Sequence, residues 1–129
     1  MQKRPQGGVI INIIGIAADR LNFKSIGTST ANAALAAFTK AMGSESTNDN
    51  IRIVGIHPGL IRTPRTEVLV NPTSDADRKA YENLMKNLPY GRMGEPSEIA
   101  NLALFLASNQ AAYISGEVMS VDGGSRYRY

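Results

Sequence analysis

Three short aliphatic runs, separated by helix-forming segments, most constrain what this chain can fold into. Residues 8–14 form a nearly continuous run rich in isoleucine, as expected of a strand buried on both faces of a parallel sheet. Residues 51–56 and 118–121 are the other two predicted strands, and His57, Pro58 and Gly59 are expected to end the former. Strands that alternate with helices predict an α/β fold with parallel strands and right-handed crossovers.

Apolar residues at helical spacing predict helices in the segments between these strands. Residues 31–42 are rich in alanine, which favours a thin helix that can approach a sheet closely, and Gly43 is its expected stop. Ser74 is the expected N-cap of a helix over residues 75–88, and Pro96 is the expected first residue of another. The polar connections left between the elements are residues 18–30 and 60–74.

Size and composition indicate a soluble, single-domain protein. The chain has 129 residues, a formal net charge of +3 and no cysteine, so one core is expected, without disulfides, a thiol nucleophile or a cysteine metal site. Its longest apolar run is too short to span a bilayer, and no signal-like segment is recognisable. Basic residues are not gathered in one region, unlike those of most nucleic-acid binders. We therefore expect a cytoplasmic protein with neither a membrane nor a nucleic acid as partner, and with no metal site.

Several segments form a set whose order and spacing are distinctive. They are GVIIN at 8–12, AALAAFT at 33–39, IRI at 51–53 with Pro58, Gly59 and Thr63, GRMGEP at 91–96, EIA at 98–100, FLAS at 105–108, GE at 116–117 and VDGG at 121–124. Together they resemble the C-terminal half of the short-chain dehydrogenase/reductase family, over nearly the whole chain. The resemblance implies part of a Rossmann-like, doubly wound parallel sheet, with about three strands and their flanking helices.

The resemblance also implies where the catalytic residues of the family would stand. In the family a serine steadies the carbonyl oxygen, a tyrosine exchanges the proton, and a lysine lowers the tyrosine pKa and holds the nicotinamide ribose. Gly15, Thr28 and Asn32 occupy these positions here. A nearby cation can tune a phenol toward neutrality, whereas an aliphatic hydroxyl is a much weaker acid. We therefore expect impaired catalysis unless Thr28, Lys24 or water supplies the proton.

Cofactor contacts follow from the same resemblance. In the family, the loop after the second of these strands meets the nicotinamide carboxamide of NAD or NADP. The glycine-rich phosphate loop belongs to an N-terminal half that this chain lacks, so residues 1–129 are expected to be one partial domain that binds dinucleotide weakly by itself. The candidate cofactor contacts are Asn32, Pro58, Gly59, Ile61 and Thr63.

Structural interpretations stay open for several of these residues. Thr28 and Asn32 are also typical of a cap and turn that lead into a helix, and Pro58 with Gly59 of a plain strand-ending turn. His57, the only histidine, is expected in a loop, with a general-base role as the alternative. Asn12 either braces the floor of an active site or satisfies backbone groups.

Two functions remain open at this point. The first is an NAD(P)-dependent oxidoreductase that acts on a small carbonyl or alcohol, with the phosphate loop supplied by a partner chain or a missing segment. The second is a non-catalytic relic or oligomerisation module, because the family forms dimers and tetramers through the alanine-rich helix and the last strand. A homo-oligomer, or pairing with the missing half, is therefore expected. The unpaired edge of the first strand would then favour association.

Overall fold

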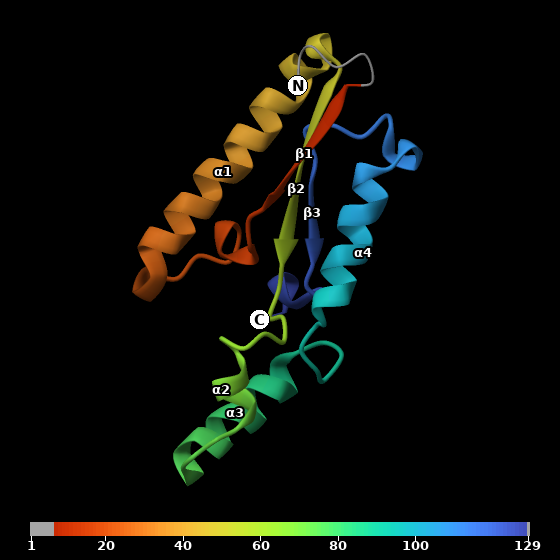
Figure 1. Cartoon of the computed structure of the whole chain (residues 1–129). Coiled ribbons are helices and arrows are strands. Elements are labelled where there is room, and N and C mark those ends of the chain that lie inside the picture. Colours follow the sequence, from red (N-terminus) through yellow and green to blue (C-terminus); the bar gives the residue numbers. More distant parts are fainter. Residues whose placement is uncertain (1–6, 129) are drawn as a thin grey trace.

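The three predicted strands form one sheet in the computed structural model, which describes residues 7–128 (Figure 1). Strands β1 (Gly8–Ile13), β2 (Ile51–Pro58) and β3 (Val118–Val121) lie in the order β1-β2-β3. Both pairs of neighbours are parallel, with Gly8 opposite Ile51 and Gly55 opposite Val118. The predicted parallel α/β arrangement is confirmed.

Helices cover both faces of this sheet. Helix α1 (Ile26–Glu45) lies on one side and α4 (Pro96–Ala107) on the other, while α2 (Glu67–Val70) and α3 (Asp75–Asn87) extend beyond the carboxyl ends of the strands (Figure 1). No helix in residues 7–128 is long and apolar enough to cross a membrane. The basic residues Lys3 and Arg4 lie outside the described part of the chain.

The apolar core lies between β2 and α4. Val54 and Ile56 of β2 pack with Leu106 of α4 and with Ala111, and all four are buried. Apolar side chains packed in this way supply most of the free energy that favours folding. Ile99, Leu102 and Ala103 of the same helix pack against this cluster.

The opposite layer, between α1 and the sheet, is built from small and polar residues. A Cβ added to Gly43 would lie 2.2 Å from the backbone of Gly116, so α1 approaches that turn as closely as a backbone can. Gly43 therefore serves close packing, and α1 continues past it to Glu45. The buried residues of α1 are Ser29, Ala36, Thr39 and Gly43.

One side-chain hydrogen bond ties this layer together. The Asn12 side-chain nitrogen Nδ2 donates to Oγ1 of Thr39 at 2.9 Å, and the Thr39 hydroxyl donates to the Leu35 carbonyl at 2.8 Å. Asn12 is therefore a structural hydrogen-bonder, as one of the two alternatives expected, but its partner is a side chain of α1 and not a backbone group.

The start of α1 differs from the prediction. The helix begins at Ile26, directly after a 3-10 turn over Phe23–Ser25, so Thr28 lies in its first turn and Asn32 in its body. The interpretation of these two residues as a cap and turn is therefore wrong. The Thr28–Thr30 segment is helical despite its low helix propensity, and Ser29 within it is buried.

Other boundaries also differ. Ile10 and Ile13 are exposed, so β1 is not buried on both faces; it pairs only with β2 within residues 7–128. Strand β2 runs through His57 to Pro58, which corrects the expected loop position of the histidine. The predicted loop over 60–74 contains α2 and a parallel bridge between Ile61 and Gly94.

Candidate functional site

Loops that follow the strands gather at one edge of the sheet, as the parallel arrangement requires. Gly59 follows β2 and packs on Asp122, which follows β3: a Cβ on Gly59 would lie 2.7 Å from the Asp122 Cα. The Gly59 N–H donates to the Val121 carbonyl at 2.9 Å. Only glycine allows the ends of these two strands to meet so closely.

Gly15, Asn32 and His57 come together on the α1 side of this edge. The His57 ring nitrogen Nδ1 lies 2.6 Å from the Gly15 carbonyl oxygen, and the side chain is buried, with 2% of its surface exposed. Gly15 has φ 108°, and a Cβ built on it would lie 3.0 Å from Nδ2 of Asn32. The structure therefore places Gly15 and Asn32, two of the three residues expected at catalytic positions, side by side.

Thr28 lies one helical turn before Asn32 on α1, so the two positions share a face of the helix. Thr28 itself is exposed. Lys24, an alternative source of the proton, lies in the 3-10 turn before α1, where its ammonium stands 5.9 Å from the centre of the Phe23 ring.

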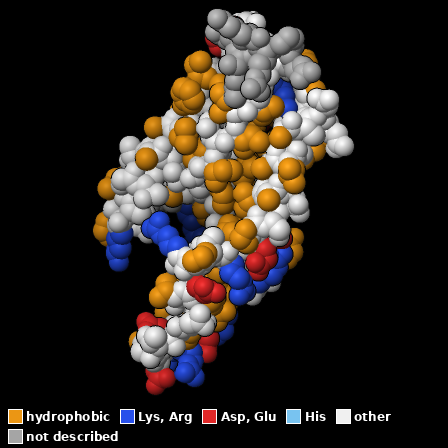
Figure 2. Space-filling view, viewed as in Figure 1, with side chains coloured by type: hydrophobic (Ala, Val, Ile, Leu, Met, Phe, Trp, Pro, Cys, Tyr) orange, Lys and Arg blue, Asp and Glu red, His pale blue; other side chains and the backbone are white. Residues whose placement is uncertain are grey.

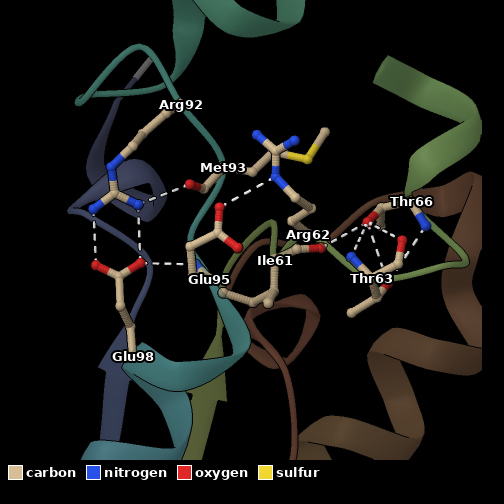
Figure 3. A network of polar contacts seen from close by, with 8 residues as sticks. All are labelled: Ile61, Arg62, Thr63, Thr66, Arg92, Met93, Glu95 and Glu98. Atoms are coloured by element: carbon tan, nitrogen blue, oxygen red, sulfur yellow. Dashed lines mark hydrogen bonds and ion pairs between the residues drawn. The ribbon is translucent and has the colours of Figure 1, made fainter. Parts of the chain in front are cut away.

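The loop that carries Ile61 and Thr63 is fixed by its own hydrogen bonds (Figure 3). The Thr66 hydroxyl donates to the Ile61 carbonyl at 2.7 Å and accepts from the Thr63 N–H at 2.8 Å. The Arg62 N–H donates to the Gly94 carbonyl at 2.8 Å, which joins this loop to the segment before α4. The loop is thus held in one shape before any ligand binds.

Two ion pairs flank that loop (Figure 3). Arg62 pairs with Glu95 at 3.1 Å, and Arg92 makes two bonds of 2.9 and 2.8 Å to the Glu98 carboxylate. The hydrogen bond from Arg92, followed by that from the Glu95 N–H, lowers the pKa of Glu98 from its ordinary 4.5 to about 2. Glu98 therefore stays ionised at neutral pH and closes the capping box of α4.

A pocket of about 270 Å³ opens between this loop, α4 and the end of β3. It lies on the α4 side of the sheet edge, whereas Gly15, Asn32 and His57 lie on the α1 side. The predicted contact Ile61 reaches the pocket; Pro58, Gly59 and Thr63 do not line it. Its lining includes Leu60, Ile61, Tyr90, Arg92, Glu98 and Asp122.

Two features of this edge were not predicted. His57 contacts Gly15, and the place of a lone histidine at the carboxyl end of a central strand was the available signal. Arg126 pairs with Asp19 at 3.1 Å and so joins the C-terminal residues to the segment after Gly15. No sequence pattern links two residues so far apart. Within residues 7–128, no group of three or more His, Cys, Asp or Glu side chains could hold a metal ion.

A parallel sheet covered on both faces, with its loops gathered at the carboxyl edge, defines a Rossmann-like α/β protein. The chain belongs to the short-chain dehydrogenase/reductase family, since residues 1–126 match the family model described as Enoyl-(Acyl carrier protein) reductase. It is 41% identical over 121 residues to the 3-oxoacyl-acyl-carrier-protein reductase FabG of Chlamydia muridarum, covering 94% of this chain and 46% of that reductase.

Solved structures agree with this assignment. L-sorbose reductase from Gluconobacter frateurii, complexed with NADPH and L-sorbose, is 34% identical with a TM-score of 0.81, over 93% of this chain and 48% of its own. A 7α-hydroxysteroid dehydrogenase complexed with NADH is 33% identical with a TM-score of 0.83, over 96% of this chain and 46% of its own. The chain thus spans about half the length of the relatives it matches.

Proposed function

We propose that this chain is the C-terminal, nicotinamide-side part of an NAD(P)-dependent oxidoreductase whose proton transfer is impaired. The observation that carries the proposal is the contact of Gly15 with Asn32 and His57 at the carboxyl edge of the sheet. Where the family pattern has a serine, a tyrosine and a lysine, Gly15, Thr28 and Asn32 offer a backbone, a hydroxyl and an amide.

The residues present suit the nicotinamide end of a dinucleotide. Gly59 packs on Asp122 and so holds the ends of β2 and β3 together, and the Ile61–Thr63 loop is fixed by Thr66. Asn32 would bond the ribose hydroxyls, and the loop would hold the carboxamide. When bound, the cofactor would supply the hydride. Relatives have been crystallised with NADPH and with NADH, so either cofactor is a candidate here.

Proton transfer is the step that these residues support poorly. A threonine hydroxyl is a weak acid and an amide carries no charge, so neither reproduces a phenol that is activated by a cation. Thr28 is also exposed to water, which opposes the desolvated setting in which such pairs work best. Turnover of a carbonyl or alcohol substrate should therefore be slow even with the cofactor bound.

The dinucleotide phosphates would need a further segment. We propose that residues 1–129 form one partial domain, and that the glycine-rich phosphate loop comes from a preceding segment or from a partner chain. This accords with the match to about 46% of the curated relatives. Without that loop, most of the binding energy of the pyrophosphate is missing.

Cofactor titration tests the proposal. Purified chain is titrated with NADH and with NADPH up to millimolar concentration, and cofactor fluorescence is recorded. We expect weak binding, with reduction of small ketones and aldehydes at most slightly above the reaction without protein. Turnover comparable to that of the full-length relatives would disprove impaired catalysis, whereas no fluorescence change at any concentration would disprove cofactor binding by this chain.

A second candidate function is an oligomerisation module, favoured by the outer face of α1. Leu35, Phe38 and Met42 are exposed at helical spacing among alanines, and 51% of the Phe38 surface is accessible. Such a stripe suits packing against a second copy of the helix. Sedimentation of the parent chain and of Phe38→Lys tests it: a dimer that the substitution converts to a monomer supports the module.

A further inference from the structure

His57 is a buried polar side chain whose contact with Gly15 belongs to the proposed site but whose own role has not been stated. It lies on β2 directly before Pro58, with 2% of its surface exposed. Its Nδ1 approaches the Gly15 carbonyl to 2.6 Å, the shortest bond made by that oxygen, which also accepts from the Ala18 N–H at 3.3 Å. The histidine therefore ties the segment that leaves β1 to the end of β2.

The chemistry of this contact fixes the state of the ring. A carbonyl oxygen only accepts hydrogen bonds, so Nδ1 must carry the proton. In the neutral ring, Nε2 then holds the lone pair. The contact is thus a directional N–H···O hydrogen bond in a buried place. Without the His57 donor, the Gly15 carbonyl would keep only the 3.3 Å hydrogen bond from the Ala18 N–H.

The backbone that this bond holds is unusual. Gly15 has φ 108° and ψ 146°, a conformation that residues with a side chain rarely adopt. Because Gly15 has no Cβ, the amide of Asn32 packs directly on it. Three features therefore depend on one another: the ring N–H of His57, the turn at Gly15 and the place of the Asn32 amide.

We propose that His57 is a positioning residue that sets where the Asn32 amide meets its ligand. The neutral amide carries both a donor and an acceptor, and this combination suits a hydroxyl-bearing group such as a sugar diol better than an anion. The inference rests on the proposed function for the identity of that ligand, NADH or NADPH. The link from His57 to Asn32 through Gly15 rests on the geometry alone.

A matched pair of substitutions separates positioning from space filling. In His57→Asn, the amide nitrogen can take the place of Nδ1, whereas in His57→Gln it reaches toward the place of Nε2. We expect His57→Asn to bind NADH and NADPH within about threefold of the parent, and His57→Gln to bind about tenfold more weakly, the effect of one buried hydrogen bond. Thermal melting verifies that both variants fold. Equal loss in two folded variants would overturn the proposal.

NMR provides a test that needs no cofactor. The ring nitrogens of His57 should show the Nδ1–H tautomer, and the Asn32 side-chain amide resonances should move in His57→Gln but stay in place in His57→Asn. A ring protonated only at Nε2, or Asn32 resonances that ignore both substitutions, would overturn the positioning role. If the parent binds neither NADH nor NADPH, the proposed function fails, and this spectrum still decides the role of His57.

Discussion

Gly15 occupies a turn in which any residue with a side chain is disfavoured. A serine here would meet two obstacles, because φ 108° strains any residue with a side chain and the new Cβ would lie 3.0 Å from the Asn32 amide. We predict that Gly15→Ser lowers the free energy of unfolding by about 1 to 3 kcal/mol and restores no activity.

Urea unfolding and a ketone-reduction assay test this prediction. Gly27 is a matched control, because it lies in the first turn of α1 with no atom within 4 Å of an added Cβ. Gly27→Ala should leave stability unchanged or raise it slightly. A Gly15→Ser protein as stable as the parent would show that the turn is not constrained as described.

Two hydroxyls in the layer under α1 should behave in opposite ways. The Ser29 hydroxyl is buried and has no hydrogen-bond partner within residues 7–128, whereas the Thr39 hydroxyl bonds Asn12 and Leu35. Ser29→Ala removes an unsatisfied polar group and raises helix propensity, so it should stabilise by about 0.5 to 1 kcal/mol. Thr39→Val should destabilise by about 1 to 3 kcal/mol.

Chemical denaturation of both variants provides the comparison. The expected effect of Ser29→Ala is small, but its sign is informative. A loss of stability would mean that the Ser29 hydroxyl makes a hydrogen bond in the folded protein. Circular dichroism should show the helix content of the parent in each variant.

At the scale of elements, α4 depends on the ion pair at its first turn. The pKa of Glu98 is lowered to about 2, chiefly by its hydrogen bond to Arg92, so the unfolded chain takes up this proton at a higher pH than the folded one. The stabilisation is therefore complete above the ordinary value of 4.5 and is lost as the pH falls toward 2. Glu98→Gln should melt below the parent at pH 7, and the difference should shrink between pH 4.5 and pH 2.

Melting curves recorded between pH 7 and pH 2 test whether the Arg92–Glu98 ion pair stabilises α4. The pair is about half exposed, so added salt should reduce the difference at pH 7. A difference in melting temperature between the parent and Glu98→Gln that stays constant down to pH 2.5 would contradict this role of the ion pair.

Elements with strong local signals could be predicted from the sequence. Strand β3 runs from Val118 to Val121 as predicted, and Ser74 caps α3 by accepting from the Asp77 N–H. The start of α1 could not be predicted, because Thr28–Thr30 has low helix propensity and is helical through tertiary packing. The role of Gly43 in close packing, rather than in ending α1, depends on Gly116 far along the chain.

The candidate site could be predicted only in part from the sequence, for the same reason. The ends of β1 at Ile13 and of β2 near Pro58 follow from hydrophobic runs, and parallel strands bring such ends to one edge. The bond between His57 and Gly15 depends on the exact pairing of β1 with β2, and the Arg126–Asp19 ion pair depends on the path of the C-terminal residues. Local patterns do not carry that information.

At the scale of the whole molecule, the β1 edge dominates how the chain should behave in solution. Figure 2 shows hydrophobic side chains gathered over the strands between α1 and α4. Ile13 has 55% of its surface exposed, and β1 pairs with β2 alone within residues 7–128. An exposed apolar strand edge is a template for association with another chain.

A lysine on this edge should separate folding from association. Ile13→Lys places a charge on a largely exposed position of β1, so we expect little change in melting temperature but a marked fall in light scattering at high protein concentration. Leu104→Lys is the control, since Leu104 is exposed on α4 at 70% and belongs to no strand edge. If both lysines reduce scattering equally, association follows general surface hydrophobicity. If only Ile13→Lys does, association takes place at the β1 edge.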